Sequence, residues 1–295
     1  MTSPLDAPGA PAGDGAALDG GGPVFRFETG FVSHRGRVRT ENEDRCFAAP
    51  EIGVFTVADG MGGHADGAFA SETVVEALAS IGTAVSAADL MARLEDRILR
   101  ANSVLWSAGE KRGTPVGSTV AVLLIFGADY ACVWSGDSRI YRVRAGSIVQ
   151  LTRDHTEGRD LFEQGLLTKE QSVNWPRRHV ITRAVGAREL PEVELEQGAV
   201  QAGDVFVICS DGLTGPLSDE DILLAAGTSA PQWACDALLS LALDRGAPDN
   251  VTVVIVRCGQ AAAGGRPRPP VRPDRNIDVT NATVAQPGPS AKGRS

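Results

Sequence analysis

Long hydrophobic runs, paired cysteines and clustered basic residues are all missing from this sequence, and each absence excludes a class of protein. The apolar stretches, such as 116–126 and 205–209, are shorter than the roughly 20 residues that a membrane-spanning helix needs. The five cysteines include no CxxC pair, so we expect buried free thiols rather than disulfides or a zinc site. A net charge of -9 argues against a nucleic-acid partner, because phosphate backbones are bound by clustered Lys and Arg.

Signatures of secretion and of several enzyme classes are missing too. Residues 1–23 contain no Lys or Arg and therefore lack the basic start of a secretory signal, so we expect a cytoplasmic protein without a membrane partner. The sequence contains no GxSxG elbow, no P-loop and no GxGxxG stretch. These absences argue against Ser-His-Asp acyl transfer, nucleotide hydrolysis and dinucleotide chemistry.

The two ends of the chain differ in composition from its middle. Residues 1–24 and 259–295 together hold 10 of the 17 prolines, and such segments bury too little apolar surface to offset the entropy lost on ordering. We expect two disordered tails, the second rich in Pro and Arg, around one domain at 25–258. That middle segment has 32 acidic and 22 basic residues, so the negative charge of the protein belongs to the expected domain.

Apolar runs of strand length recur along the middle segment, with helical periodicities between them. The strand-like runs are 31–34, 45–49, 54–58, 119–126, 130–134, 140–143, 205–209 and 251–256. Helical spacing predicts helices over 68–81, 87–108, 219–226 and 231–243, with Ser86 and Ser218 as N-caps. The strands occur in hairpin-like groups rather than in alternation with helices, which predicts an α+β fold. Residues 156–180 fit neither pattern, and we expect an inserted, partly helical flap there.

Four aspartates share one setting, next to Gly, Asn or Ser where an apolar strand ends or begins: Asp59, Asp137, Asp211 and Asp249. A single Asp-Gly is ordinary turn chemistry, and that is the plainer interpretation of any one of them. Four in an acidic domain favour another explanation, because clustered carboxylates repel unless a proton or cation neutralises them. Carboxylate and carbonyl oxygens are the ligands of Mg²⁺ and Mn²⁺, so the pattern predicts a hard divalent cation.

A fifth segment adds a basic residue and further acids, in the order Arg39, Glu43 and Asp44. One interpretation is a solvated charged turn before a strand. In the functional interpretation, Asp44 joins the metal carboxylates, Glu43 orients a water molecule and Arg39 binds an anion. A guanidinium fork matches the oxygens of phosphate, so this combination points to phosphate chemistry.

Eight motifs, read in order, resemble those of the metal-dependent (type 2C) protein Ser/Thr phosphatases, and in particular their bacterial branch. They are Arg39-x-x-x-Glu43-Asp44, VADGMGGH at 57–64, GST at 117–119, SGDSR at 135–139, DHT at 154–156, TRAVG at 182–186, SDGL at 210–213 and DNVTV at 249–253. Each motif alone is weak, but together they extend over nearly the whole expected domain. The flap also has a distant similarity to phosphatases encoded with type VI secretion systems.

The resemblance implies a four-layer α-β-β-α sandwich, in which two packed antiparallel sheets are flanked by helix pairs. It implies two Mn²⁺ or Mg²⁺ ions, with a third, weaker ion at Asp137 and Asp211. The ligands of the first two ions would be Asp44, Asp59, the Gly60 carbonyl, Asp211 and Asp249.

The activity that the resemblance implies is hydrolysis of phosphoserine and phosphothreonine in proteins by a metal-activated water. Such a monomeric enzyme would reverse a bacterial Ser/Thr kinase, with that kinase and its phosphorylated substrates as partners. The alternative is a regulatory relative that binds phosphoproteins with little or no turnover. Such a relative is expected to lack a metal carboxylate, and this sequence has them all.

The source of the proton for the leaving oxygen stays open at the level of sequence. Eukaryotic members of the family have a His directly after the metal-binding Asp-Gly, where this chain has Met61. His64 lies three positions further on and is the candidate general acid. Alternatively, His64 only packs at the start of the following helix and water supplies the proton.

Overall fold

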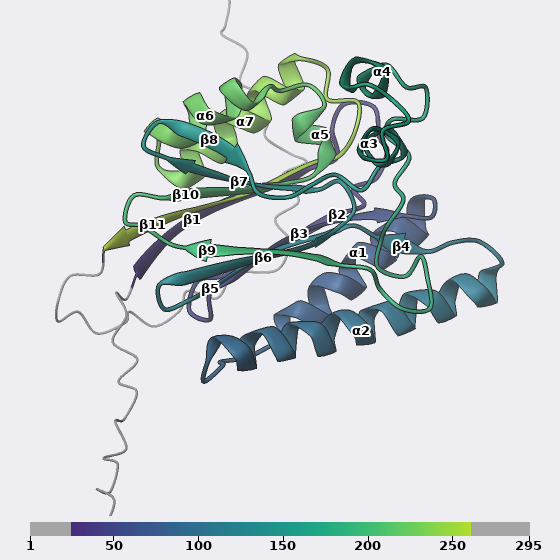
Figure 1. Ribbon diagram of the computed structural model, residues 1–295, viewed down its shortest axis with the longest axis horizontal. Helices are drawn as coiled ribbons and strands as arrows, with labels where there is room; N and C mark the ends of the chain where they lie inside the picture. The colour runs from purple at the N-terminus through teal and green to yellow at the C-terminus, as the bar shows by residue number, and fades with distance from the viewer. Residues whose placement is uncertain (1–24, 261–295) are drawn as a thin grey trace, which may run out of the picture.

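The computed structural model describes residues 25–260, and in this range two antiparallel sheets lie face to face between two layers of helices (Figure 1). The five-stranded sheet has the order β1 (Phe25–His34), β11 (Val251–Gln260), β10 (Val205–Cys209), β7 (Arg139–Arg144) and β8 (Ser147–Gln150). The six-stranded sheet has the order β2 (Asp44–Ala49), β3 (Val54–Met61), β5 (Val120–Phe126), β6 (Asp129–Ser135) and β9 (Glu194–Ala199), and β4 (Gly117–Ser118) pairs with β3. The predicted α+β sandwich is confirmed.

Each sheet is covered on its outer face by a pair of helices. Helices α1 (His64–Ala79) and α2 (Ala87–Arg112) pack on the six-stranded sheet, while α6 (Asp219–Thr228) and α7 (Pro231–Asp244) pack on the five-stranded sheet (Figure 1). The central strands are therefore buried on both faces, which explains why they are continuous apolar runs rather than alternating ones. No helix within residues 25–260 is both long and apolar enough to cross a membrane.

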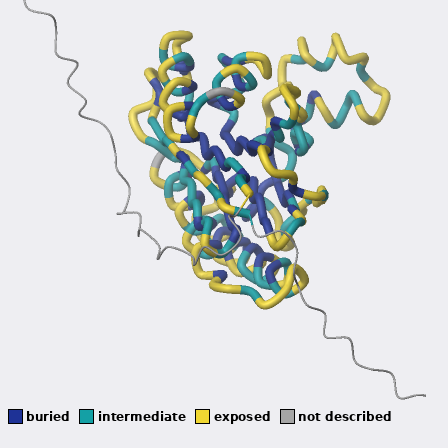
Figure 2. Tube along the Cα trace, turned by 90° about the vertical axis from the view of Figure 1, so that its left-hand side faces the viewer, coloured by how far each residue is buried: buried dark blue, intermediate teal, exposed yellow. Residues whose placement is uncertain are grey.

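Three apolar clusters hold these layers together. The cluster between the sheets is built around Phe55, Leu123 and Phe206, and one further cluster lies under each helix pair. Figure 2 shows the result, a buried interior enclosed by exposed outer turns and helix faces. All five cysteines are free, four of them buried, as expected for thiols that fill a core.

The helix ends follow the predicted capping chemistry in two cases and depart from the prediction in a third. Ser86 caps α2 by accepting a hydrogen bond from the Asp89 backbone, and Ser218 forms a reciprocal capping box with Asp221 at α6. Helix α1 runs from His64 to Ala79, four residues ahead of the predicted start at residue 68 and two short of the predicted end. Its first turn is polar or small, so it carries none of the apolar periodicity from which the helix was predicted.

Several elements lack an apolar run of strand or helix length and were not predicted: β4, β8, β9 and the short helix α5 (Asp211–Thr214). Residues 156–180 contain α3 (Glu157–Glu163) and α4 (Lys169–Val173), and a bridge between Thr156 and Ile181 closes their base. Strand β11 continues to Gln260, opposite Phe25, which is two residues beyond the expected domain end. The expected tails at 1–24 and from residue 261 onward lie outside the described residues.

Candidate metal centre

Two aspartates of the six-stranded sheet face each other across neighbouring strands. Asp44 begins β2 and is paired in register with Asp59 near the end of β3. Asp44 is only 1% exposed, and its Oδ2 accepts a hydrogen bond of 2.7 Å from the Ser210 hydroxyl. Its other oxygen, Oδ1, is buried with no hydrogen-bond partner. The register of the β2–β3 ladder thus brings two carboxylates together at one end of the sandwich.

The five-stranded sheet supplies two more aspartates to the same end. Asp211 follows β10 as the first residue of α5, and Asp249 precedes β11. Ser210 connects the sheets, because its backbone N–H donates to Thr252 while its hydroxyl accepts from the Thr252 N–H and donates to Asp44. A fifth aspartate, Asp137, lies in the turn after β6, with 5% of its surface exposed. One oxygen each of Asp137 and Asp211 is buried without a partner.

Burial and mutual repulsion raise the pKa values of these carboxyls. Burial is the largest cause and raises the pKa of Asp44 to about 7, of Asp137 to about 8 and of Asp211 to about 6. Burial also raises the pKa of Asp59 well above its usual range, and the charges of Asp44, Asp211, Asp137 and Asp249 raise it further. The four aspartates and Asp249 therefore form one acidic centre, whose charge needs a counter-charge.

The donor atoms of this centre fit a hard divalent cation. Buried carboxylate oxygens are normally hydrogen-bonded, yet three of this set have no partner. All the donors are oxygens, which suits Mg²⁺ or Mn²⁺ rather than zinc. Among residues 25–260, no three Asp, Glu, His or Cys side chains are already grouped as a closed ion site. Arg39 instead holds one oxygen of Asp249, and Ser210 holds one of Asp44.

Arg39 stands at the rim of the acidic centre. Its Nη2 lies 2.6 Å from Asp249 Oδ2, and 48% of its side chain is exposed. The hydrogen bond that Arg39 donates to Asp249, together with the nearby charges of Asp249, Glu43 and Asp59, raises the pKa of the guanidinium. Arg39 is therefore a fixed positive charge beside the carboxylates, reachable from solvent.

Glu43 lies where the end of β3 meets the start of α1. A Cβ atom on Gly67 would lie 1.9 Å from Glu43 Oε2 and 2.9 Å from the Gly60 carbonyl oxygen, and a Cβ on Gly60 would lie 1.8 Å from the Gly67 carbonyl oxygen. Neither position has room for a side chain, so both must be glycine. The Glu43 carboxylate and the Gly60 carbonyl both lie against Gly67 and are therefore near each other. His64 is the first residue of α1, and the structure describes its backbone only.

Sequence reasoning missed the side chains that hold these residues in place. Asn250 accepts a hydrogen bond from the Glu43 backbone and donates to the carbonyls of Arg35 and Glu41. Thr119 accepts from the Asp59 backbone N–H at 3.0 Å. Both lie inside motifs that were recognised, beside the expected ligands, but only the folded chain shows which atoms they hold.

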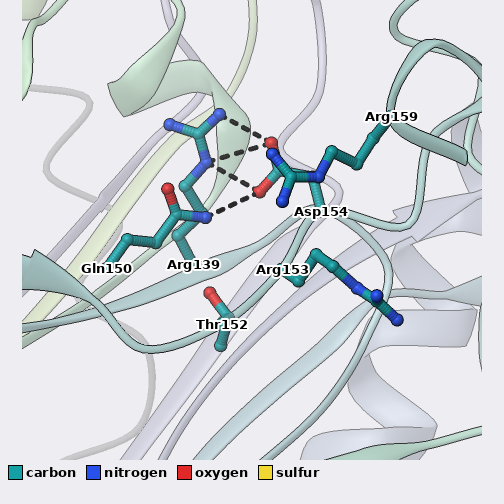
Figure 3. A pocket seen from close by; sticks show the side chains of 6 residues that line it. All are labelled: Arg139, Gln150, Thr152, Arg153, Asp154 and Arg159. Carbon is teal, nitrogen blue, oxygen red and sulfur yellow. Dashed lines mark hydrogen bonds and ion pairs between the residues drawn. The ribbon is translucent and has the colours of Figure 1, made fainter. Parts of the chain in front are cut away.

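A polar pocket of about 310 Å³ lies between β7, β8 and the base of the flap (Figure 3). Its lining residues are Arg139, Gln150, Thr152, Arg153, Asp154 and Arg159. Arg139 grips Asp154 with two nitrogens, the shortest contact being 2.6 Å, and the Asp154 charge contributes to the raised pKa of Asp137. This ion pair joins β7 to the base of the flap, beside Asp137.

Comparison with known proteins places the chain in a family. The family model described as protein phosphatase 2C matches residues 33–237. The serine/threonine protein phosphatase PstP of Mycobacterium tuberculosis is 38% identical over 225 residues, which is 76% of this chain and 43% of that protein. This chain therefore spans less than half the length of that curated relative.

Solved structures give the same result. PppA, described as a key regulatory component of the type VI secretion system in Pseudomonas aeruginosa, matches with a TM-score of 0.73 and 37% identity over 79% of this chain and 97% of that one. The catalytic domain of PstP, solved with two manganese ions, matches with a TM-score of 0.72 and 36% identity over 80% of this chain and 100% of that one. With its acidic centre at one end of an α-β-β-α sandwich, the chain belongs to the protein phosphatase 2C family.

Proposed function

We propose that this protein hydrolyses phosphoserine and phosphothreonine in other proteins with the help of Mn²⁺ or Mg²⁺. The observation that carries the proposal is the set of buried carboxylate oxygens without partners on Asp44, Asp137 and Asp211. Membership of the protein phosphatase 2C family and the two manganese ions of the PstP structure support it. Two ions would be held by Asp44, Asp59, the Gly60 carbonyl, Asp211 and Asp249, and a third by Asp137 and Asp211.

Each residue of the centre has its own role in the proposed reaction. When bound, divalent cations neutralise the carboxylates, polarise the phosphoryl oxygens and make water a stronger nucleophile. Arg39 binds the equatorial phosphate oxygens with the part of its guanidinium that faces solvent. Glu43, next to the Gly60 carbonyl, accepts a hydrogen bond from the attacking water and orients it. His64, at the start of α1, gives the leaving oxygen its proton.

We also propose a biological setting for this activity. A phosphatase of this kind opposes a Ser/Thr kinase, acts on the substrates of that kinase and works as a monomer in the cytoplasm. A relative that binds phosphoproteins without turnover is not favoured, because all the carboxylates expected to bind metal are present.

The proposed activity is tested by phosphate release from a phosphothreonine peptide. We expect release by the full chain to stop after treatment with EDTA and to return with Mn²⁺. The matched control is Asp129→Asn, which changes an exposed aspartate at the start of β6 and should leave release unchanged. A folded protein, verified by circular dichroism, that releases no phosphate at any Mn²⁺ concentration would contradict the proposal.

A further inference from the structure

His155 is fully buried and lies against the turn that carries Asp137. Its ring Nδ1 accepts a hydrogen bond of 3.1 Å from the Gly136 N–H, and its own backbone N–H donates to the Gly136 carbonyl at 2.9 Å. Both polar backbone atoms of Gly136 are thus bonded to this one residue. His155 therefore holds Gly136, the residue directly before Asp137, at both its N–H and its carbonyl.

The other ring nitrogen of His155 is directed away from the turn. Because Nδ1 accepts, the ring proton lies on Nε2, which is 3.3 Å from Glu194 Oε1 in β9. Glu194 also accepts from Arg183 Nη1 at 2.7 Å and is paired with Arg153. The imidazole stacks on Trp134, with an interplanar angle of 17°. The ring is therefore fixed by groups that belong to β6, β9 and the segment after the flap.

The residues on either side of Asp137 both contact Thr119. Gly136 has a φ of 109°, and a Cβ atom there would lie 2.6 Å from the Thr119 methyl group, so no side chain fits. On the other side of Asp137, the Ser138 hydroxyl is 2.7 Å from the Thr119 hydroxyl. Asp137 thus lies between two anchored neighbours, while its own Oδ1 is buried without a partner.

We infer that His155 is a positioning residue, whose Nδ1 fixes the Asp137 turn so that the carboxylate can bind a divalent cation. The inference rests on the proposed function, since it assigns a role to a residue that touches neither metal nor substrate. Residues that orient a metal ligand without touching the metal contribute about 10- to 100-fold to metal affinity. The inferred role differs between the two ring nitrogens, because Nδ1 holds the turn and Nε2 only holds the ring.

Two substitutions separate the two nitrogens. In His155→Asn, the amide oxygen stands where Nδ1 stood and still accepts from Gly136, whereas in His155→Gln the amide nitrogen replaces Nε2 and the Gly136 N–H loses its acceptor. We expect His155→Gln to raise the Mn²⁺ concentration for half-maximal turnover about 10-fold or more, and His155→Asn to change it less than about 3-fold. Calorimetric titration with Mn²⁺ should show the same difference in the weakest binding step, and Asp137→Asn should remove that step.

The matched control is Asn102→Ala. Asn102 is also buried and accepts from a glycine N–H, that of Gly186, but none of its hydrogen bonds is to the aspartates or to their neighbours in sequence, so its loss should lower Tm without changing the Mn²⁺ dependence. Equal shifts for the two His155 variants, or no shift in either folded variant, would overturn the inference. If both variants unfold, Glu194→Gln takes their place, with an expected rise of about 3-fold, and no change there would overturn it.

Measurements of Mn²⁺ binding and of phosphate release on the wild-type protein distinguish a failure of this inference from a failure of the proposed function. If it binds Mn²⁺ but releases no phosphate, the proposed function fails and calorimetry on the variants still decides the role of His155. If it binds no Mn²⁺, both fail.

Discussion

The two sides of the acidic centre are held in place by different means. Asp44 and Asp59 lie within strands, and the register of a six-residue antiparallel ladder sets their separation. Asp137 lies in a turn whose position depends on two side chains, His155 and Thr119. The ladder consists of many backbone hydrogen bonds, whereas the turn is held by two side chains and one backbone hydrogen bond from His155 to Gly136. We therefore expect the strand side to be the more rigid part of the site and the turn side the more adjustable part.

The strongest test of this comparison replaces one carboxylate on each side. Asp59→Asn should lower turnover by more than about 100-fold at every Mn²⁺ concentration, because it removes an expected metal ligand of the strand side. The loss should exceed the roughly 10- to 100-fold loss that is usual when a residue hydrogen-bonded to a metal ligand is replaced. Asp137→Asn should lose only the additional turnover gained at high Mn²⁺. Phosphate release measured across a Mn²⁺ titration distinguishes the two, with Asp129→Asn as the control. Equal losses at saturating Mn²⁺ would mean that the two sides do not differ.

A smaller effect is expected from Ser210, which supports the rigid side from the other sheet. Ser210→Ala removes the 2.7 Å hydrogen bond to Asp44 and leaves the Thr252 N–H without its side-chain acceptor. The Mn²⁺ concentration for half-maximal turnover should rise about 10-fold, whereas Ser210→Thr, which keeps a hydroxyl, should stay closer to wild type. If Ser210→Ala shifts it less than about 2-fold, the ladder alone is sufficient to position Asp44.

The smallest expected effect is on stability as a function of pH. The raised pKa values of Asp44, Asp137 and Asp211 mean that the folded protein binds more protons than the unfolded chain above pH 4. Without divalent cations, stability should therefore fall as the pH rises from about 5 to 8. We expect the Tm of EDTA-treated protein to be lower at pH 8 than at pH 5.5 by at least about 4 °C.

Added Mn²⁺ should remove this pH dependence, because the cation replaces the protons as the counter-charge. Asp59→Asn should make this fall in stability smaller in the EDTA-treated protein, because the Asp59 carboxyl, whose own pKa is raised, is gone. Differential scanning calorimetry measures both effects. An EDTA-treated wild type whose Tm is the same at both pH values would show that the carboxylates carry no uncompensated charge.

The fold was largely predictable because its central strands are buried on both faces. Strands β5 and β10 appear in the sequence as uninterrupted apolar runs, and the apolar stretches of β3 and β11 are each broken only by a threonine. Ser86 and Ser218 mark helix starts by local chemistry. Strand β9, with the sequence ELEQGA, was missed because it is a polar strand at the edge of its sheet, defined by pairing with β6. Propensity and periodicity do not report such pairing.

The candidate ligands were also visible in the sequence, as aspartates at strand ends, but their surroundings were not. Arg39 was expected to bind phosphate. The structure shows in addition that it donates a hydrogen bond to Asp249, which is 210 residues away in the sequence. The structural role of His155 in holding Gly136 depends likewise on a turn and a flap base that meet only after folding.

By itself, the sequence determined which strands form the core and which oxygen-bearing side chains are available for a cation. Those properties depend on residue type and on neighbours a few positions apart. Only the tertiary structure decided that the aspartates of both sheets share one buried end, with raised pKa values and partnerless oxygens. Burial and repulsion depend on distances set by strand register and sheet packing, and these join residues far apart in the chain.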